Sequence, residues 1–175
     1  QTREGKKNYS LLVVNLSLTT DTKLNKMKLK KATAIQALQK TMYEGSEVDG
    51  FYGDGKSIVE VPEIPIKHSF ADQLYIRQMD LKKGHVILGA VHNHLHVWFL
   101  LKGKVIINNN GEKIEHIAPC YTVSKPGSQR IILALEDAIF VNVHKNPTNN
   151  KDIAELEKEI VSMTIEEYNN KYNNI

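Results

Sequence analysis

Short runs of apolar residues, separated by turn signals, fill the second half of the chain. From residue 73 to about residue 145, runs rich in β-branched and aromatic residues are separated by pairs such as Lys102-Gly103 and Asn110-Gly111. Asn110-Gly111 is the strongest hairpin signal, because both residues accept a positive φ. About seven short strands at this spacing predict an antiparallel sandwich or barrel.

The segments on either side of this region have different periodicities. Residues 9–18 favour a strand or an extended arm, whereas residues 24–43 place apolar residues at helical spacing with lysines on the opposite face. We interpret the lysine face as solvated. The glycine-rich stretch 44–57 lacks the ending and the strand context of a phosphate-binding loop, so it is best explained as a linker.

Helical periodicity returns near the end of the chain. One apolar face begins at Ile153 and ends at Met163, and Asn150 or Asp152 is the expected N-cap. The chain then divides into three parts: residues 1–60, an N-terminal arm, basic helix and glycine-rich loop; residues 61–146, the β-barrel; and residues 147–175, a C-terminal helix and tail.

Composition narrows the classes of function. The 175 residues carry a net charge of +3 with 25% charged residues, which argues against a dedicated nucleic-acid binder. No apolar run reaches the roughly 18 residues that a membrane-spanning helix needs. Cys120 is the one cysteine, which excludes an internal disulfide and a four-thiolate zinc site. We interpret it as a buried, inert thiol.

Three histidines occupy alternate positions in the stretch VHNHLHVWFLLKG, residues 91–103. In a continuous strand His92, His94 and His96 would share one face, and imidazole is a ligand for Zn²⁺, Fe²⁺, Ni²⁺ and Cu²⁺. The opposite face, which includes Val97, is nearly all apolar. That pattern predicts a strand covered on both sides, either by other parts of the chain or by another subunit.

The spacing of glycines and histidines resembles the first sequence motif of the cupin superfamily, which is a family of small jelly-roll barrels. Gly84 and Gly103 fit the two glycines that bound this motif. Between them, His92 takes the position of the second histidine ligand, His96 takes the position of the glutamate ligand, and Ala90 replaces the first histidine. The resemblance implies a single antiparallel jelly-roll barrel with His92 and His96 directed inward.

The second cupin motif is matched less well. Gly127 fits a motif glycine, whereas Arg130 takes the position of the remaining histidine ligand. A guanidinium is always protonated, so it cannot bind a metal, but it is a receptor for a carboxylate or phosphate. It would also keep nearby histidines neutral by lowering their pKa. We expect Arg130 to lie close enough to His92 and His96 to share their pocket.

Residues 64 to 168 resemble more closely a subgroup of cupin-like proteins found in tailed-phage genomes. The shared features include the segment IPIKHSFADQLYIRQM, the pair His92 and His96, and the segment LEDAIFVNVHKNPTNNKDIAELE. His68 and His144 match histidines of this subgroup and are secondary metal-ligand candidates. The resemblance implies a protein of the host cytoplasm or of the phage particle, with no membrane association.

Three hypotheses for function follow. The first is a structural or interaction module without catalytic activity, which would form homo-oligomers or bind other virion proteins, as barrels of this family commonly dimerise through their outer face. The second is a metalloenzyme, such as a dioxygenase, isomerase or lyase, with Zn, Fe, Ni or Cu held by His92, His96 and His94. The third is a metal-free pocket in which Arg130 binds an anion. The histidines and Arg130 could also bond only to one another, to backbone and to water.

Overall fold

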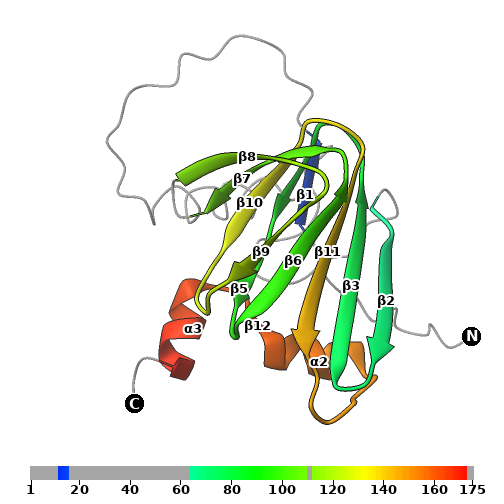
Figure 1. Cartoon of the computed structure of the whole chain (residues 1–175). Coiled ribbons are helices and arrows are strands. Elements are labelled where there is room, and N and C mark those ends of the chain that lie inside the picture. The colour runs from blue at the N-terminus through cyan, green and yellow to red at the C-terminus, as the bar shows by residue number, and fades with distance from the viewer. Residues whose placement is uncertain (1–11, 16–63, 110–111, 173–175) are drawn as a thin grey trace, which may run out of the picture.

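Two antiparallel five-stranded sheets face each other in the computed structural model, which describes residues 12–15, 64–109 and 112–172 (Figure 1). The first sheet contains, in spatial order, β1 (Leu12–Asn15), β4 (His85–Leu88), β10 (Arg130–Ala134), β7 (Lys104–Asn109) and β8 (Glu112–Ile117). The second contains β2 (Ile66–Ala71), β3 (Leu74–Leu81), β11 (Ala138–Lys145), β6 (His96–Lys102) and β9 (Cys120–Ser124). The antiparallel jelly roll predicted from the sequence is therefore confirmed.

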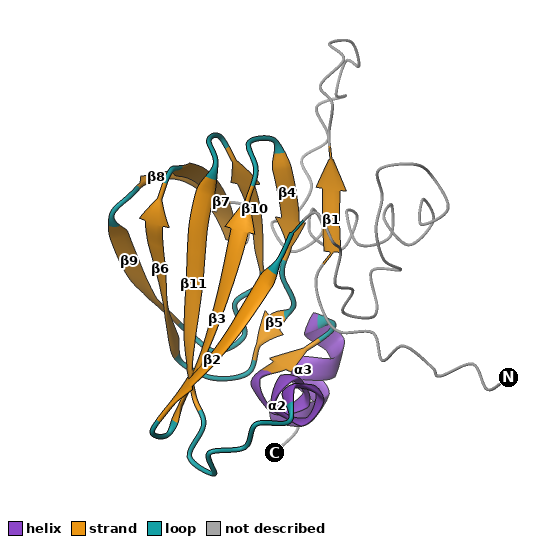
Figure 2. Cartoon of the chain, turned by 90° about the vertical axis from the view of Figure 1, so that its right-hand side faces the viewer, coloured by secondary structure: helices purple, strands orange, loops and turns teal. Residues whose placement is uncertain are grey.

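A third, two-stranded sheet and two helices complete the described part of the chain. β5 (Val91–His92) pairs with β12 (Val161–Ser162), and the helices are α2 (Ile153–Ile160) and α3 (Ile165–Tyr172). Both helices lie at the same end of the barrel, next to β5 and β12 (Figure 2). None of the described helices is long and apolar enough to cross a membrane.

Inward-facing side chains form cross-strand rows in the second sheet, because its strands pair in register and side chains alternate between faces. The row nearest the helices is polar and aromatic. The row at the opposite end is apolar and includes Met79, Phe140 and Leu100, which belong to the main hydrophobic core. Trp98 stacks on Phe140 with ring centroids 5.0 Å apart. The barrel is thus filled by hydrophobic side chains at one end and by polar ones at the end where the helices lie.

The single C-terminal helix predicted up to Met163 is wrong, because the chain forms two helices with a short strand between them. Asp152 caps α2, since its side chain accepts a hydrogen bond from the backbone N–H of Glu155 over 3.1 Å. α2 then ends at Ile160, and the next two residues extend to pair with β5. The side chain of Thr164 accepts from the N–H of Glu167 and starts α3. Asp152 and Thr164 each cap a helix, so the segment whose apolar residues predicted one helix forms two.

The structure describes only residues 12–15 of the N-terminal segment, so it tests only part of what the sequence predicted there. The strand or arm expected over residues 9–18 contributes β1, which pairs with β4. The basic helix over residues 24–43 and the glycine-rich linker lie outside the described residues. Asn110 and Gly111 also lie outside them, while β7 and β8 pair as an antiparallel hairpin with Asn109 opposite Glu112. The proposed boundaries at residues 60 and 146 stay predictions.

Candidate functional site

The polar row at the helix end of the barrel brings together residues that are far apart in sequence. Tyr75 on β3 lies opposite His144 on β11, and His96 on β6 lies opposite Ser124 on β9. Since Val143 pairs with Val97, His144 and His96 are neighbours on the same inner face. The strand register, rather than sequence proximity, therefore places two imidazoles side by side.

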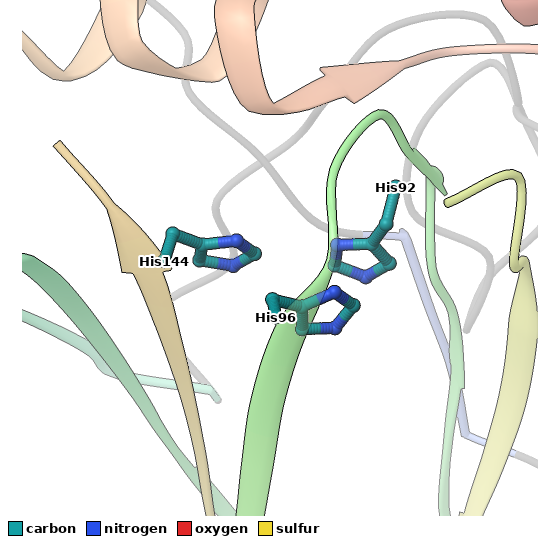
Figure 3. A group of neighbouring side chains, drawn as sticks. All are labelled: His92, His96 and His144. Atoms are coloured by element: carbon teal, nitrogen blue, oxygen red, sulfur yellow. The ribbon is translucent and has the colours of Figure 1, made fainter. Parts of the chain in front are cut away.

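His92, His96 and His144 form one cluster, with each ring supplied by a different strand (Figure 3). The ring centroids of His92 and His96 are 3.9 Å apart, those of His96 and His144 4.8 Å, and those of His92 and His144 5.4 Å. One nitrogen from each of the three rings lies within 4.8 Å of the others. His144, a secondary candidate in the sequence, thus joins the cluster.

His94 does not join this cluster, and the continuous strand that would have aligned it with His92 and His96 is wrong. The chain leaves the strand between β5 and β6, because Asn93 bonds to the C-terminal segment instead. The backbone N–H of Asn93 donates to the carbonyl of Ile160, and its side chain accepts from the hydroxyl of Ser162. The ring of His94 lies against Tyr172 on α3, with centroids 6.1 Å apart.

Arg130 reaches this cluster from the opposite sheet. Its Nη2 lies 2.7 Å from Nε2 of His96 and 2.9 Å from Oγ of Ser124, and the residue is only 5% exposed. A guanidinium only donates, so Nε2 of His96 is the acceptor and carries no proton. The proton of the neutral ring is then on Nδ1, which lies 3.3 Å from the carbonyl oxygen of His94. Arg130 thus lies in direct contact with His96, as predicted, on a strand of the opposite sheet.

Burial keeps the three clustered histidines neutral at pH 7. It is the largest cause of the lowered pKa of His96, which falls to about 4, and the charge of Arg130 is the second. The pKa values of His92 and His144 are also held well below the usual range, by burial first and then by the charge of neighbouring histidines and arginines. Burial lowers the pKa of Arg130 to about 10, which leaves the guanidinium charged.

Three buried polar atoms around the cluster have no hydrogen-bond partner among the described residues: Nδ1 of His92, Nε of Arg130 and Oδ1 of Asn142. Buried polar groups in folded proteins are nearly always bonded, so each unpaired atom calls for an explanation. Asn142 is on β11, one inward-facing position away from His144. The three atoms belong to the same polar end of the barrel, where a bound molecule would supply the missing partners.

A pocket of about 500 Å³ adjoins the cluster, and Arg130 lines it. Its other walls combine apolar side chains, among them Trp98, Ile107 and Ile114, with the hydroxyl-bearing Ser124 and Ser128. The two serine hydroxyl oxygens are 2.8 Å apart. None of the clustered histidines lines the pocket, so Arg130 is the residue that connects the pocket to them.

Two other candidates lie away from this centre. Nδ1 of His68 is 2.7 Å from the hydroxyl of the fully buried Tyr75, so His68 hydrogen-bonds within the barrel wall and is not part of the cluster. Cys120 is only partly buried, and burial raises the pKa of its thiol. Its thiol is therefore protonated at neutral pH, whereas the burial predicted from the sequence is only partial.

Sequence reasoning missed the buried polar residues Arg77 and Asn142. Both occupy inward positions, Arg77 on β3 and Asn142 on β11, and they lie opposite each other in the strand pairing. The sequence pattern could have identified Arg77, because it lies two residues from Tyr75 and two from Met79 in a strand whose side chains alternate between faces. A charged residue at an inward position of such a strand indicates a functional or buried polar site.

The three imidazoles fit a transition metal in kind but not in their present arrangement. Imidazole nitrogens ligate zinc at roughly 2.1 Å, so neighbouring ligand atoms in a tetrahedral site are roughly 3.4 Å apart. The clustered nitrogens are separated by up to 4.8 Å, and the lone pair of His96 is occupied by Arg130. A metal bound by these residues would require the rings to move together and Arg130 to move away.

No family model matches the sequence, and no curated protein sequence matches it. Several solved structures resemble the described fold at low identity. KdgF from Halomonas sp. is 18% identical over 49% of this chain and 82% of that chain, with a TM-score of 0.44. A cupin superfamily protein from Desulfitobacterium hafniense is 12% identical over 50% and 83%, with a TM-score of 0.42. Acetylacetone dioxygenase from Acinetobacter johnsonii is 17% identical over 50% and 66%, with a TM-score of 0.42.

These likenesses concern the fold and carry no activity over to this chain. The assignment of the fold rests on the chain's own strand order, in which β2-β3-β11-β6-β9 faces β1-β4-β10-β7-β8. Gly84 and Gly103 adopt positive φ at the turns before β4 and β7. The described residues therefore form an antiparallel jelly roll.

Proposed function

We propose that this protein binds a small ligand carrying a carboxylate or phosphate, with Arg130 as the receptor for the oxyanion. The observation that carries this proposal is the buried, uncompensated charge of Arg130. Within the described ranges, no carboxylate forms an ion pair with Arg130, whose partners are a neutral histidine and a serine hydroxyl. A buried charge is normally paired, because removing it from water costs several kcal/mol.

The guanidinium also has unused donor capacity. Nε of Arg130 is buried and has no partner. An oxyanion that contacts Nε and one terminal nitrogen would form the paired hydrogen bonds that guanidinium geometry favours. The ligand would thereby satisfy an orphan donor and neutralise the charge in the same step.

The pocket beside Arg130 has the size and lining of a small-molecule site. Its volume of about 500 Å³ lies within the range of roughly 300 to 1,000 Å³ that ligand pockets span. Trp98, Ile107 and Ile114 offer apolar surface, and Ser124 and Ser128 offer hydroxyl groups next to the guanidinium. The lining also includes the carboxylate of Glu112, so the anionic end of a ligand is expected at Arg130 and its body along the apolar side chains.

A pair of probes that differ only in charge tests the proposal. Benzoate should bind metal-free protein and benzamide should not, because only benzoate neutralises Arg130. Trp98, the only tryptophan in the chain, lines the pocket, so its fluorescence reports binding directly. Phenyl phosphate in place of benzoate would show whether the site prefers a phosphate or a carboxylate.

Substitutions assign the binding to Arg130. Arg130→Gln keeps a hydrogen-bond donor for His96 and should weaken benzoate binding at least tenfold. Lys125→Gln removes another cation of the pocket lining and should weaken it less than threefold, since Lys125 is exposed and its charge is already solvated. Equal binding of benzoate and benzamide, or unchanged binding by the Arg130 variant, would refute the proposal.

A second proposal concerns self-association through the outer surface of β6 and β9. The outer β6–β9 face consists of Val97, Phe99, Leu101, Tyr121 and Val123. Leu101 is 55% exposed, Tyr121 67% and Val123 57%, so apolar side chains on an edge strand and its neighbour are in contact with solvent. We propose that this face packs against a second copy of the chain. The role in a virion and the relation to phage proteins stay predictions.

A further inference from the structure

The feature that leads beyond anion binding is the conflict between Arg130 and a metal at His96. Because Arg130 donates to Nε2 of His96, Nε2 is the ring nitrogen that carries a lone pair. That lone pair is occupied by the hydrogen bond from Arg130. A metal ion and the guanidinium would therefore compete for the same atom. His96 can ligate only when Arg130 has left it.

The other two histidines of the cluster do not share this obstacle. Nδ1 of His92 is buried without a partner, so its use as a ligand breaks no existing hydrogen bond. His144 is buried beside both other rings, with its ring centroid 5.4 Å from that of His92 and 4.8 Å from that of His96. The state of Arg130 therefore decides whether two or three nitrogens are available.

Electrostatic repulsion also requires that Arg130 leave His96 before a metal binds. A divalent cation placed in the cluster would be repelled by the guanidinium that contacts His96, and no carboxylate among the described residues offsets this charge. An anion in the adjoining pocket attracts both the guanidinium and a divalent cation. Its arrival would thus weaken the bond between Arg130 and His96 and also lower the repulsion that a metal meets.

Arg130 already contacts both places between which it would move. It hydrogen-bonds His96 on one side and lines the pocket with Ser124 and Ser128 on the other. Its Nε is buried without a partner among the described residues, so it is a further donor for an anion once the side chain turns towards the pocket.

We infer that an oxyanion in the pocket and a divalent transition metal on His92, His96 and His144 bind cooperatively, with Arg130 as the switch between them. The anion draws the guanidinium away from His96, and the freed Nε2 completes a three-nitrogen site. This inference rests on the proposed anion site and adds a metal site that is open only when the ligand is present. Because coupling between two sites is reciprocal, the metal raises the affinity for the anion by the same factor.

Metal titrations with and without the probe anion test the inference. Co²⁺ is added to the full chain, purified without a histidine tag, in the presence of saturating benzoate or of benzamide. Binding is followed by calorimetry and by the visible absorption of cobalt. Benzoate should raise the affinity for Co²⁺ at least tenfold, and benzamide should leave it unchanged. A metal affinity that benzoate leaves unchanged or lowers would overturn the inference.

Single substitutions test the role of Arg130 separately from the role of the histidine ligands. Arg130→Met removes both the charge and the donor to His96, so it should bind Co²⁺ more tightly than the wild type without benzoate, and benzoate should then have no further effect. His144→Ala should reduce Co²⁺ affinity in the presence of benzoate at least tenfold. His94→Ala is the matched control and should leave it unchanged, because His94 lies outside the cluster. A larger loss with His94→Ala than with His144→Ala would refute the assigned ligand set.

The same experiments distinguish this inference from the proposed function. Benzoate binding to metal-free protein, read from Trp98 fluorescence, tests the anion site alone. If benzoate binds but leaves cobalt affinity unchanged, the coupling is refuted and the anion site stands. If benzoate does not bind the metal-free protein, both the anion site and the coupling are refuted.

Discussion

Arg130 and His96 come from opposite sheets of the barrel and form a buried hydrogen bond of 2.7 Å between Nη2 and Nε2. This contact fixes the tautomer of His96, since the guanidinium can only donate. It also places a permanent positive charge within hydrogen-bond distance of a candidate metal ligand. The chemistry of the site therefore depends on what, if anything, removes Arg130 from His96.

Arg130→His should give the tightest metal binding of any single change at this site. The substitution removes the cation and supplies a further imidazole beside His96, and both effects favour a divalent ion. We expect its Zn²⁺ affinity to exceed that of the wild type at least tenfold, and that of Arg130→Gln by a smaller factor. Calorimetric titration of the three proteins without added anion measures both steps.

The comparison with Arg130→Gln is the control, because that variant removes the charge without adding a ligand. Lys125→His adds an imidazole to the rim of the same pocket and should leave Zn²⁺ affinity unchanged. Zn²⁺ binding by Arg130→His that is no tighter than that of the wild type would mean that the three histidines are structural.

Metal-free protein should lose stability as the pH falls from 7 towards 4. His96 has a pKa of about 4 in the folded chain against an ordinary value of 6.5, so between these values the unfolded chain takes up a proton that the folded chain does not. The free energy of unfolding should fall by about 3 kcal/mol from His96 alone. His92 and His144, whose pKa values are shifted in the same direction, add to this loss.

Urea denaturation at pH 7 and pH 4.5, in the presence of a chelator, measures this loss. His96→Asn keeps an acceptor for Arg130 but has no titratable group, so the difference in stability between the two pH values should be smaller in this variant. An equal difference in wild type and variant would show that other groups cause the acid sensitivity.

The spacing of glycines and short strands was sufficient to predict the barrel, because turn chemistry and side-chain alternation are local properties of the sequence. It did not place the secondary candidate His144 beside His96, which is 48 residues away in sequence. The two rings meet because β11 pairs with β6 in one particular register. Such a register depends on the packing of the whole sheet, and no local pattern specifies it.

The error at His94 has a similar cause. Alternation aligns His92, His94 and His96 only if the strand is continuous, and the hydrogen bonds of Asn93 to Ile160 and Ser162 interrupt it. Those partners lie in the segment after α2, where an extension of the helical face to Met163 had been expected. The strand β12 and the interruption at Asn93 therefore have one structural cause.

Gly103→Ala should destabilise the fold more than Gly84→Ala. Both glycines have a positive φ, of 80° at Gly103 and 91° at Gly84, so each alanine introduces backbone strain of about 1 to 2 kcal/mol. A Cβ at Gly103 would also collide with the backbone carbonyl of Asp137, whereas one at Gly84 meets no atom within 4 Å. Thermal unfolding of the two variants therefore separates strain from collision. Equal losses of stability would mean that the turn at Gly103 rearranges freely.

Lysine substitutions on the outer β6–β9 face should weaken self-association. A specific interface typically buries about 1,200 to 2,000 Å² in total, and exposed aromatic and aliphatic residues near its centre contribute most to its affinity. Tyr121 and Val123 are adjacent outward positions on β9, which is the edge strand of its sheet. Tyr121→Lys and Val123→Lys should each raise the dissociation constant at least tenfold, because a lysine charge would have to be desolvated at the contact.

Sedimentation velocity over a range of protein concentrations measures this change. Leu74→Lys is the matched control, since Leu74 is an exposed leucine, 40% accessible, at the start of β3 on the same sheet but away from β9. It should leave association unchanged. β9 also leaves its free backbone edge open to pairing with another strand, and each lysine would obstruct that route as well, because charged side chains on an edge strand oppose strand addition. A wild type that stays monomeric at tens of micromolar would refute this interface, as would a control that weakens association as much as the β9 variants.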